Sequence, residues 1–260
     1  MNRALILDVE GTTTSLAFVK ETLFPYAATR LDAFLDAYEQ RPDVAAILLE
    51  VQRLAAAPRA TEPLNAAQGP DVAAGAEGPE MGGGSRAEAV SDNPRTILKA
   101  WMAADAKVTP LKILQGLIWQ AGYASGELQG HVYDEVAPVL RSLCARGYRL
   151  AIFSSGSVAA QRLLFRHSVA GDLTPYIEAY FDTRTGAKRE ASSYRAIARA
   201  LRLPPARCAF FSDIAPELHA ATEAGMPCAQ LVRPGGAPAP GQTHLPDFHA
   251  LDAWVTAYFS

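Results

Sequence analysis

The chain has 260 residues, of which 49% are hydrophobic and 20% are charged, and its formal net charge at pH 7 is −3. Such a chain can bury a sizeable core, as one large domain or as one domain with an insertion. The slight negative charge argues against binding to nucleic acid or to an anionic membrane, and no apolar run approaches the length of a membrane span.

The first predicted element is a strand at Ala4–Leu7. Four successive apolar residues without a charge are typical of a strand buried on both faces of a parallel sheet. The strand is followed by two carboxylates, Asp8 and Glu10, and then by Gly11 and three threonines. Ligands bind at the carboxyl ends of strands in open α/β sheets. Taken alone, the stretch fits polar turn residues better than a ligand site.

A block of helices is predicted directly after this strand. Phe18–Tyr38 is helical in pattern with Pro25 as a bend, and Asp43–Ala56 places its large apolar residues on one face. Residues 58–90 are rich in Ala, Gly, Pro and Glu and almost lack large apolar side chains. Such a segment cannot bury enough surface to offset its ordering entropy, so we expect a flexible or disordered loop.

Helices resume at Asn93-Pro94, which suit an N-cap and a first helical position, and run to about Ala104. Thr109-Pro110 repeats this pattern and opens Leu111–Ala121, with Gly122 as the predicted end. Residues 18–130 contain no convincing strand. We therefore predict a helical cap at 18–130, inserted into a catalytic core of residues 1–17 and 131–260.

Strands and helices alternate in the remainder of the chain. This alternation implies a parallel, doubly wound α/β sheet. The predicted helices are Pro138–Arg146, Ser157–His167, Glu190–Leu201 and Ala215–Ala224, and the predicted strands are Arg149–Ser154, Ala179–Asp182, Cys208–Asp213 and Ala229–Val232.

A small hydroxyl-rich turn follows the strand at Arg149–Ser154. It contains Ser154, Ser155 and Gly156 and leads into a helix at Ser157. Hydroxyls, free backbone N–H groups and a helix N-terminus together suit a phosphate. Simple capping of the helix explains one serine well and three less well. The Gly-Lys spacing of a P-loop is absent from the sequence.

Lys188 and Asp213 also follow predicted strands. A lysine in a loop is usually a solvated surface charge, and Asp213 is also a suitable N-cap for the helix near Ala215. However, Asp8 and Asp213 both fall at the carboxyl ends of strands of one sheet. There they are placed to share a hard divalent cation through oxygen ligands.

Cysteine and histidine usage gives no sign of a metal site. Three cysteines are odd in number and lack ligand spacing, which predicts reduced, mostly buried thiols in a cytoplasmic protein. The cysteines are Cys144, Cys208 and Cys228, and the histidines are His131, His167, His219, His244 and His249.

The sequence also bears on location and assembly. Asp8 comes too early to leave room for a signal peptide, and no exposed apolar repeat demands a dimer, so we expect a cytoplasmic monomer.

Four motifs in this order resemble the haloacid dehalogenase-like hydrolase superfamily. Its first motif, usually Asp-x-Asp-x-Thr, matches residues 8–12, with Glu10 in place of the second Asp. The later motifs match Ser154, Lys188 and Asp213. With Glu10 at this position of the first motif, the sequence resembles the enolase-phosphatase family of methionine salvage. The segments that carry this resemblance are DVEGTTTSLAFVKETLFPY, LKILQGLIWQAGY, FSSGSVAAQRLLFRHS and FDTRTGAKRE. The similarity spans nearly the whole chain except the stretch around 58–90.

This resemblance implies a phosphoryl-transfer site. Asp8 would attack phosphorus, Glu10 would act as acid and base, and Lys188 would bind the phosphoryl oxygens together with the turn of Ser154, Ser155 and Gly156. One Mg²⁺ per subunit would be held by Asp8, the backbone carbonyl of Glu10, and Asp213.

The resemblance also implies a substrate, 2,3-diketo-5-methylthiopentyl 1-phosphate, which is enolised and then dephosphorylated to the acireductone. Two alternatives compete with this assignment: a related phosphatase for another small phosphoester, and a non-catalytic binding protein on the same fold. Retention of Asp8, Lys188 and Asp213 argues against the second of these.

Overall fold

The computed structural model describes residues 2–57 and 93–259. The chain divides into two compact units, Met1–Leu31 with Gln115–Ser260 and Asp32–Leu114. The predicted bounds of core and cap at 17 and 130 stay a prediction, and the loop predicted at 58–90 lies outside the described residues. None of the described helices is long and apolar enough to cross a membrane.

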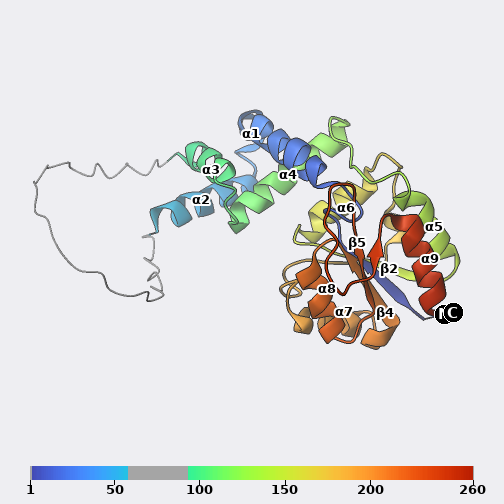
Figure 1. The fold of residues 1–260 in the computed structure, drawn as a ribbon. Helices are drawn as coiled ribbons and strands as arrows, with labels where there is room; N and C mark the ends of the chain where they lie inside the picture. The colour runs from blue at the N-terminus through green and yellow to red at the C-terminus, as the bar shows by residue number, and fades with distance from the viewer. Residues whose placement is uncertain (1, 58–92, 260) are drawn as a thin grey trace, which may run out of the picture. The chain divides into compact units, whose positions relative to one another are not determined.

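A six-stranded sheet in the order β3-β2-β1-β4-β5-β6 forms the centre of the larger unit (Figure 1). All neighbouring strands are parallel, so the predicted doubly wound α/β sheet is confirmed. β1 lies between β2 and β4 and is buried throughout, as its uninterrupted apolar sequence predicts. The strands are β1 (Ala4–Leu7), β2 (Arg149–Phe153), β3 (Ala179–Phe181), β4 (Cys208–Ser212), β5 (Cys228–Leu231) and β6 (His244–Leu245).

Two clusters of buried apolar side chains cover the two faces of the sheet. Side chains alternate along a strand, so Leu5 and Leu7 join one cluster while Ala4 and Ile6 join the other. α5, α6 and α9 pack in the first cluster, and α7 and α8 pack in the second. These helices are α5 (Val136–Ala145), α6 (Val158–Arg166), α7 (Ala191–Ala200), α8 (Ala215–Glu223) and α9 (Phe248–Phe259).

The described residues between β1 and α5 contain helices and no strand, as the sequence predicts. A π-helical turn at Phe18–Leu23 runs directly into α1, close to the predicted bend at Pro25. Asn93 caps α3, because its side chain accepts a hydrogen bond from Arg95 N at 2.9 Å. The helices are α1 (Phe24–Tyr38), α2 (Pro42–Ala56), α3 (Pro94–Ala103) and α4 (Thr109–Ser125).

Three features of the structure differ from the sequence-based expectations. α4 does not end at Gly122 but continues to Ser125. A Cβ on Gly122 would lie 2.5 Å from Tyr26 Oη, so this glycine permits close packing between helices and does not end one. β6 and α9 were not predicted: β6 has two residues, and α9 is apolar along most of its length.

Candidate active site

The turn after β1 fixes the direction of the Asp8 carboxylate. Asp8 N donates to Phe211 O at 2.9 Å, which continues the ladder between β1 and β4. Val9 O then accepts from the backbone N–H groups of residues 12, 13 and 14 at 3.2, 2.9 and 2.9 Å. Asp8 is 4% exposed, and its Oδ1 accepts from Val9 N at 2.7 Å. The carboxylate is therefore held by backbone groups at the carboxyl end of a central strand.

Gly11 lets this turn approach Asp213, which follows β4. Its φ is +73°, and an added Cβ would lie 2.2 Å from Asp213 Oδ2. Any other residue would therefore be strained and would collide with the Asp213 carboxylate. Burial and the neighbouring Asp8 raise the pKa of Asp213 to about 6. Asp213 Oδ1 is buried and has no hydrogen-bond partner among the described residues, which suits a cation ligand.

Lys188 bridges two buried acids. Its Nζ lies 2.6 Å from Asp8 Oδ1 and 2.6 Å from Glu217 Oε2, and its side chain is 11% exposed. Burial lowers the pKa of Lys188, but the two carboxylates outweigh burial, so the pKa lies above its ordinary value. The ammonium group therefore stays charged beside Asp8. Tyr194 Oη donates to Lys188 O at 2.7 Å and fixes the backbone of this loop.

Glu217, in the first turn of α8, is a site residue that the sequence reasoning missed. Its Oε2 lies 3.0 Å from Ser212 Oγ, which is itself 3.1 Å from Asp8 Oδ2. Burial raises the pKa of Glu217 above its ordinary value, and the negative charge of Asp8 adds to this effect. The available signal was an acid one helical turn beyond Asp213.

The serine turn divides between two roles. Ser154 and Ser155 line the same pocket as Asp8, and Ser154 is 3% exposed. Gly156 N donates to Ser154 Oγ at 3.2 Å, and Gly156 is not one of the described residues that line the pocket. Ser157 caps α6 by accepting from Ala160 N at 3.2 Å. Capping thus accounts for Ser157, whereas the two preceding serines face the pocket.

The pocket has a volume of about 120 Å³ and brings together residues from four separate segments, which follow β1, β2, β3 and β4. Four acids and one lysine line it, so the ionised site carries an excess of negative charge. A phosphate dianion would add to that charge, which makes a further cation necessary. The lining residues are Asp8, Glu10, Leu16, Ser154, Ser155, Lys188, Asp213, Ile214 and Glu217.

The donor set fits a hard divalent cation with few protein ligands. In residues 2–57 and 93–259, no three His, Cys, Asp or Glu side chains converge closely enough to hold a metal by themselves. Mg²⁺ commonly takes one or two carboxylates and completes its shell with waters and substrate phosphate. Asp8 and Asp213, with the buried unpartnered oxygen of the latter, meet that requirement.

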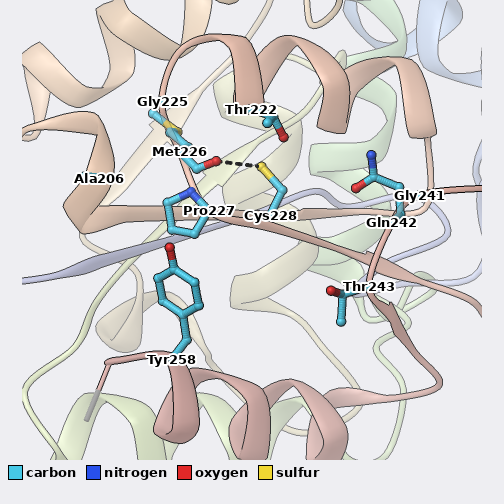
Figure 2. A pocket seen from close by; sticks show the side chains of 10 residues that line it. All are labelled: Ala206, Thr222, Gly225, Met226, Pro227, Cys228, Gly241, Gln242, Thr243 and Tyr258. Carbon is cyan, nitrogen blue, oxygen red and sulfur yellow. Dashed lines mark hydrogen bonds between the residues drawn. The ribbon is translucent and has the colours of Figure 1, made fainter.

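A second hollow, of about 390 Å³, lies at the amino ends of β4, β5 and β6 (Figure 2). It has no charged side chain among the described residues that line it. Cys228 Sγ there donates to Met226 O at 3.3 Å, and burial raises the pKa of this thiol to about 11. The lining residues are Ala206, Thr222, Gly225, Met226, Pro227, Cys228, Gly241, Gln242, Thr243 and Tyr258.

The cysteines are free thiols, as predicted. Cys208 is buried, whereas Cys144 and Cys228 are partly buried. Burial raises the pKa of each thiol, so all three are poor nucleophiles.

Comparisons with known proteins agree on one family. The family model described as haloacid dehalogenase-like hydrolase matches residues 2–225. The chain is 45% identical over 253 residues to a Methylococcus capsulatus protein named Enolase-phosphatase E1, covering 96% of this chain and 98% of that relative. A Drosophila mojavensis protein of the same name is 42% identical, with 91% and 87% covered.

Solved structures show the same fold. The UTR4 protein of Saccharomyces cerevisiae matches with a TM-score of 0.71 and 29% identity, covering 95% of this chain and 98% of that chain. CbbY from Rhodobacter sphaeroides matches with a TM-score of 0.53 and 20% identity, covering 95% of both chains, and it supports the fold alone.

Proposed function

Because the chain belongs to the haloacid dehalogenase-like hydrolases and, within them, to the enolase-phosphatases, we propose that the pocket at the end of β1 performs both half-reactions of that family. The chain is an enolase-phosphatase of methionine salvage, as its motifs predict. It enolises 2,3-diketo-5-methylthiopentyl 1-phosphate and dephosphorylates the enol to the acireductone. A cytoplasmic location and a monomeric state remain predictions from the sequence.

Asp8 is the proposed phosphoryl nucleophile. Its carboxylate attacks phosphorus, the bond from phosphorus to the leaving oxygen breaks, and an aspartyl-phosphate forms. Lys188 Nζ, 2.6 Å from Asp8 Oδ1, is placed to bind a phosphoryl oxygen as it approaches that carboxylate. Ser154 and Ser155, which line the same pocket, bind the other phosphoryl oxygens. This pairing of a backbone-held carboxylate with a buried lysine is the observation that carries the proposal.

Glu10 is the proposed acid and base. It lies two residues beyond Asp8 and lines the same pocket. Glu10 protonates the leaving oxygen when Asp8 takes the phosphoryl group, and then removes a proton from the water that releases phosphate from Asp8. In the preceding enolisation, Glu10 is the candidate to take the proton next to the carbonyl group.

Asp8, Asp213 and the backbone carbonyl of Glu10 are the proposed ligands of one Mg²⁺. When bound, the ion supplies neutralisation of phosphate charge and polarisation of substrate oxygen. Asp213 contributes a carboxylate oxygen that receives no hydrogen bond from the part of the chain that the structure describes, and Gly11 leaves room for that carboxylate against the turn.

A spectral time course with the diketone phosphate tests the assignment. We expect absorbance of the enol to rise and fall while free phosphate accumulates. Release of phosphate from unrelated small phosphoesters, without an enol signal from the diketone phosphate, would favour a different phosphatase on this fold.

A further inference from the structure

Two exposed apolar side chains stand at a pocket that is otherwise polar and charged. Leu16 is 44% exposed and Ile214 is 37% exposed, and both line the pocket with Asp8 and Lys188. Leu16 follows the turn after β1, whereas Ile214 directly follows Asp213 at the start of α8. Large apolar groups left in contact with water beside a charged site favour contact with an apolar part of a ligand.

The backbone beside each of these residues is fixed. Ser15 N, preceding Leu16, donates to His131 Nδ1 at 3.2 Å, and Ser15 Oγ accepts from Phe18 N at 3.0 Å. Ile214 N donates to Ser212 Oγ at 3.1 Å. Since both backbones are held before a ligand arrives, little ordering opposes contact with these side chains.

The size of the pocket requires the substrate to extend past its charged lining. A volume of about 120 Å³ is well below the roughly 300 Å³ at which ordinary small-molecule pockets begin. With the phosphoryl group between Asp8, Ser154 and Lys188, the carbon chain must leave the charged part of the site. Among the described residues, Leu16 and Ile214 are the apolar side chains that line this pocket, and the carbon chain of the substrate would lie against them.

We propose that Leu16 and Ile214 contact the carbon chain of the substrate and set a preference for phosphoesters with an apolar chain over polyhydroxylated ones. The proposal rests on the proposed function, because it requires the phosphoryl group to lie at Asp8. A sugar phosphate of the same length would place hydroxyl groups against both side chains, and those hydroxyls would lose water without gaining hydrogen bonds.

Two non-hydrolysable phosphonates measure this preference without turnover. n-Pentylphosphonate and a tetrahydroxypentylphosphonate have the same chain length and phosphoryl mimic, and calorimetry with Mg²⁺ gives both dissociation constants. We expect the apolar ligand to bind about tenfold more tightly, and Leu16→Ala or Ile214→Ala to reduce that ratio about threefold to fivefold each. Leu16→Met should retain the ratio. Val169→Ala is a matched control, because Val169 is 52% exposed and lies outside the pocket.

Equal affinities in the unsubstituted protein would overturn the proposal. An unchanged ratio in both alanine variants, or equal weakening of both ligands, would do the same. Failure of the proposed function is read separately, from the enol and phosphate signals with the diketone phosphate. A protein with the expected ratio and no enol signal would keep the apolar contact and lose the enolase assignment.

Discussion

The two hollows lie at opposite ends of the parallel strands and differ in size and in chemistry. The larger, about 390 Å³ at the amino ends of β4, β5 and β6, is lined by neutral residues (Figure 2). The smaller, about 120 Å³ at the carboxyl end of β1, concentrates four acids and a lysine. Burying like charges costs free energy, and Asp213 Oδ1, which has no hydrogen-bond partner within residues 2–57 and 93–259, offsets none of that cost. We therefore place the proposed reaction site by its concentration of charge and not by the volume of the hollow.

The largest expected effect comes from removing the proposed nucleophile, Asp8, at the carboxyl end of β1. Asp8→Asn keeps the shape of the side chain but removes its nucleophilic charge, so phosphate release should fall by several orders of magnitude. Enolisation does not require Asp8 as a nucleophile, so at saturating Mg²⁺ the phosphorylated enol should accumulate in this variant. Enol absorbance and free phosphate, followed in one reaction, measure the two steps.

The neutral hollow supplies the control for this variant. Gln242→Ala removes a polar side chain that lines the larger hollow, and it should leave both signals near their original rates. A large loss of turnover in Gln242→Ala would contradict the assignment of the reaction to the smaller, charged hollow alone. Equal loss of enol and phosphate in Asp8→Asn would show that Asp8 serves both steps.

The next largest effect concerns the cation. Asp213→Asn removes one of the two carboxylates assigned to Mg²⁺, so turnover should fall severely and recover in part when Mg²⁺ is raised. Titration of activity with Mg²⁺ for both proteins measures the shift in apparent affinity. Full turnover in excess chelator would rule out the metal assignment.

A smaller loss is expected from Glu217→Gln. This change removes one of the two negative charges 2.6 Å from Lys188 Nζ while preserving the size of the side chain. Because Glu217 contacts the proposed catalytic Lys188 and is assigned no step of its own, we expect phosphate release to fall about tenfold to a hundredfold. Glu223→Gln is a matched control on α8, where its side chain is 74% exposed beside Arg195. Equal rates in the two variants would show that Glu217 has no part in holding Lys188.

Much of the charged pocket could be predicted from the sequence, because the carboxyl ends of parallel strands lie on the same side of a sheet. Asp8 and Asp213 each follow a short apolar strand, so a sheet of parallel strands brings them to one edge. Glu217 was not predictable in this way, since its position in the sequence does not reveal that its carboxylate lies 2.6 Å from Lys188 Nζ. Gly122 was misread because its packing against Tyr26 is a tertiary contact, which local sequence does not encode. β6 has two residues, too few for an alternating pattern.

The smallest expected effect tests how the turn beside the charged pocket is supported. His131 Nδ1 lies 3.2 Å from Ser15 N, which can only donate, so this nitrogen accepts and carries no hydrogen. It also lies 3.0 Å from Thr14 Oγ1. Burial lowers the pKa of His131 below its ordinary value of 6.5, despite the nearby Asp134.

The charges facing this ring are those of Asp134, Arg233 and Glu135. The half-buried imidazole is harder to protonate in the folded protein than in the unfolded chain. The stabilisation by neutral His131 is therefore present above about pH 6.5 and is lost as the pH falls through the lowered pKa of the folded protein. His131→Asn offers an amide oxygen near the position of Nδ1 and does not titrate. Urea unfolding at about pH 7.5 and about pH 5 should show a drop in the free energy of unfolding that is larger for the original protein, by about 1 kcal/mol, the worth of one hydrogen bond. Identical drops in both proteins would mean that His131 does not support the turn through its neutral ring, and that the turn depends on its own backbone hydrogen bonds.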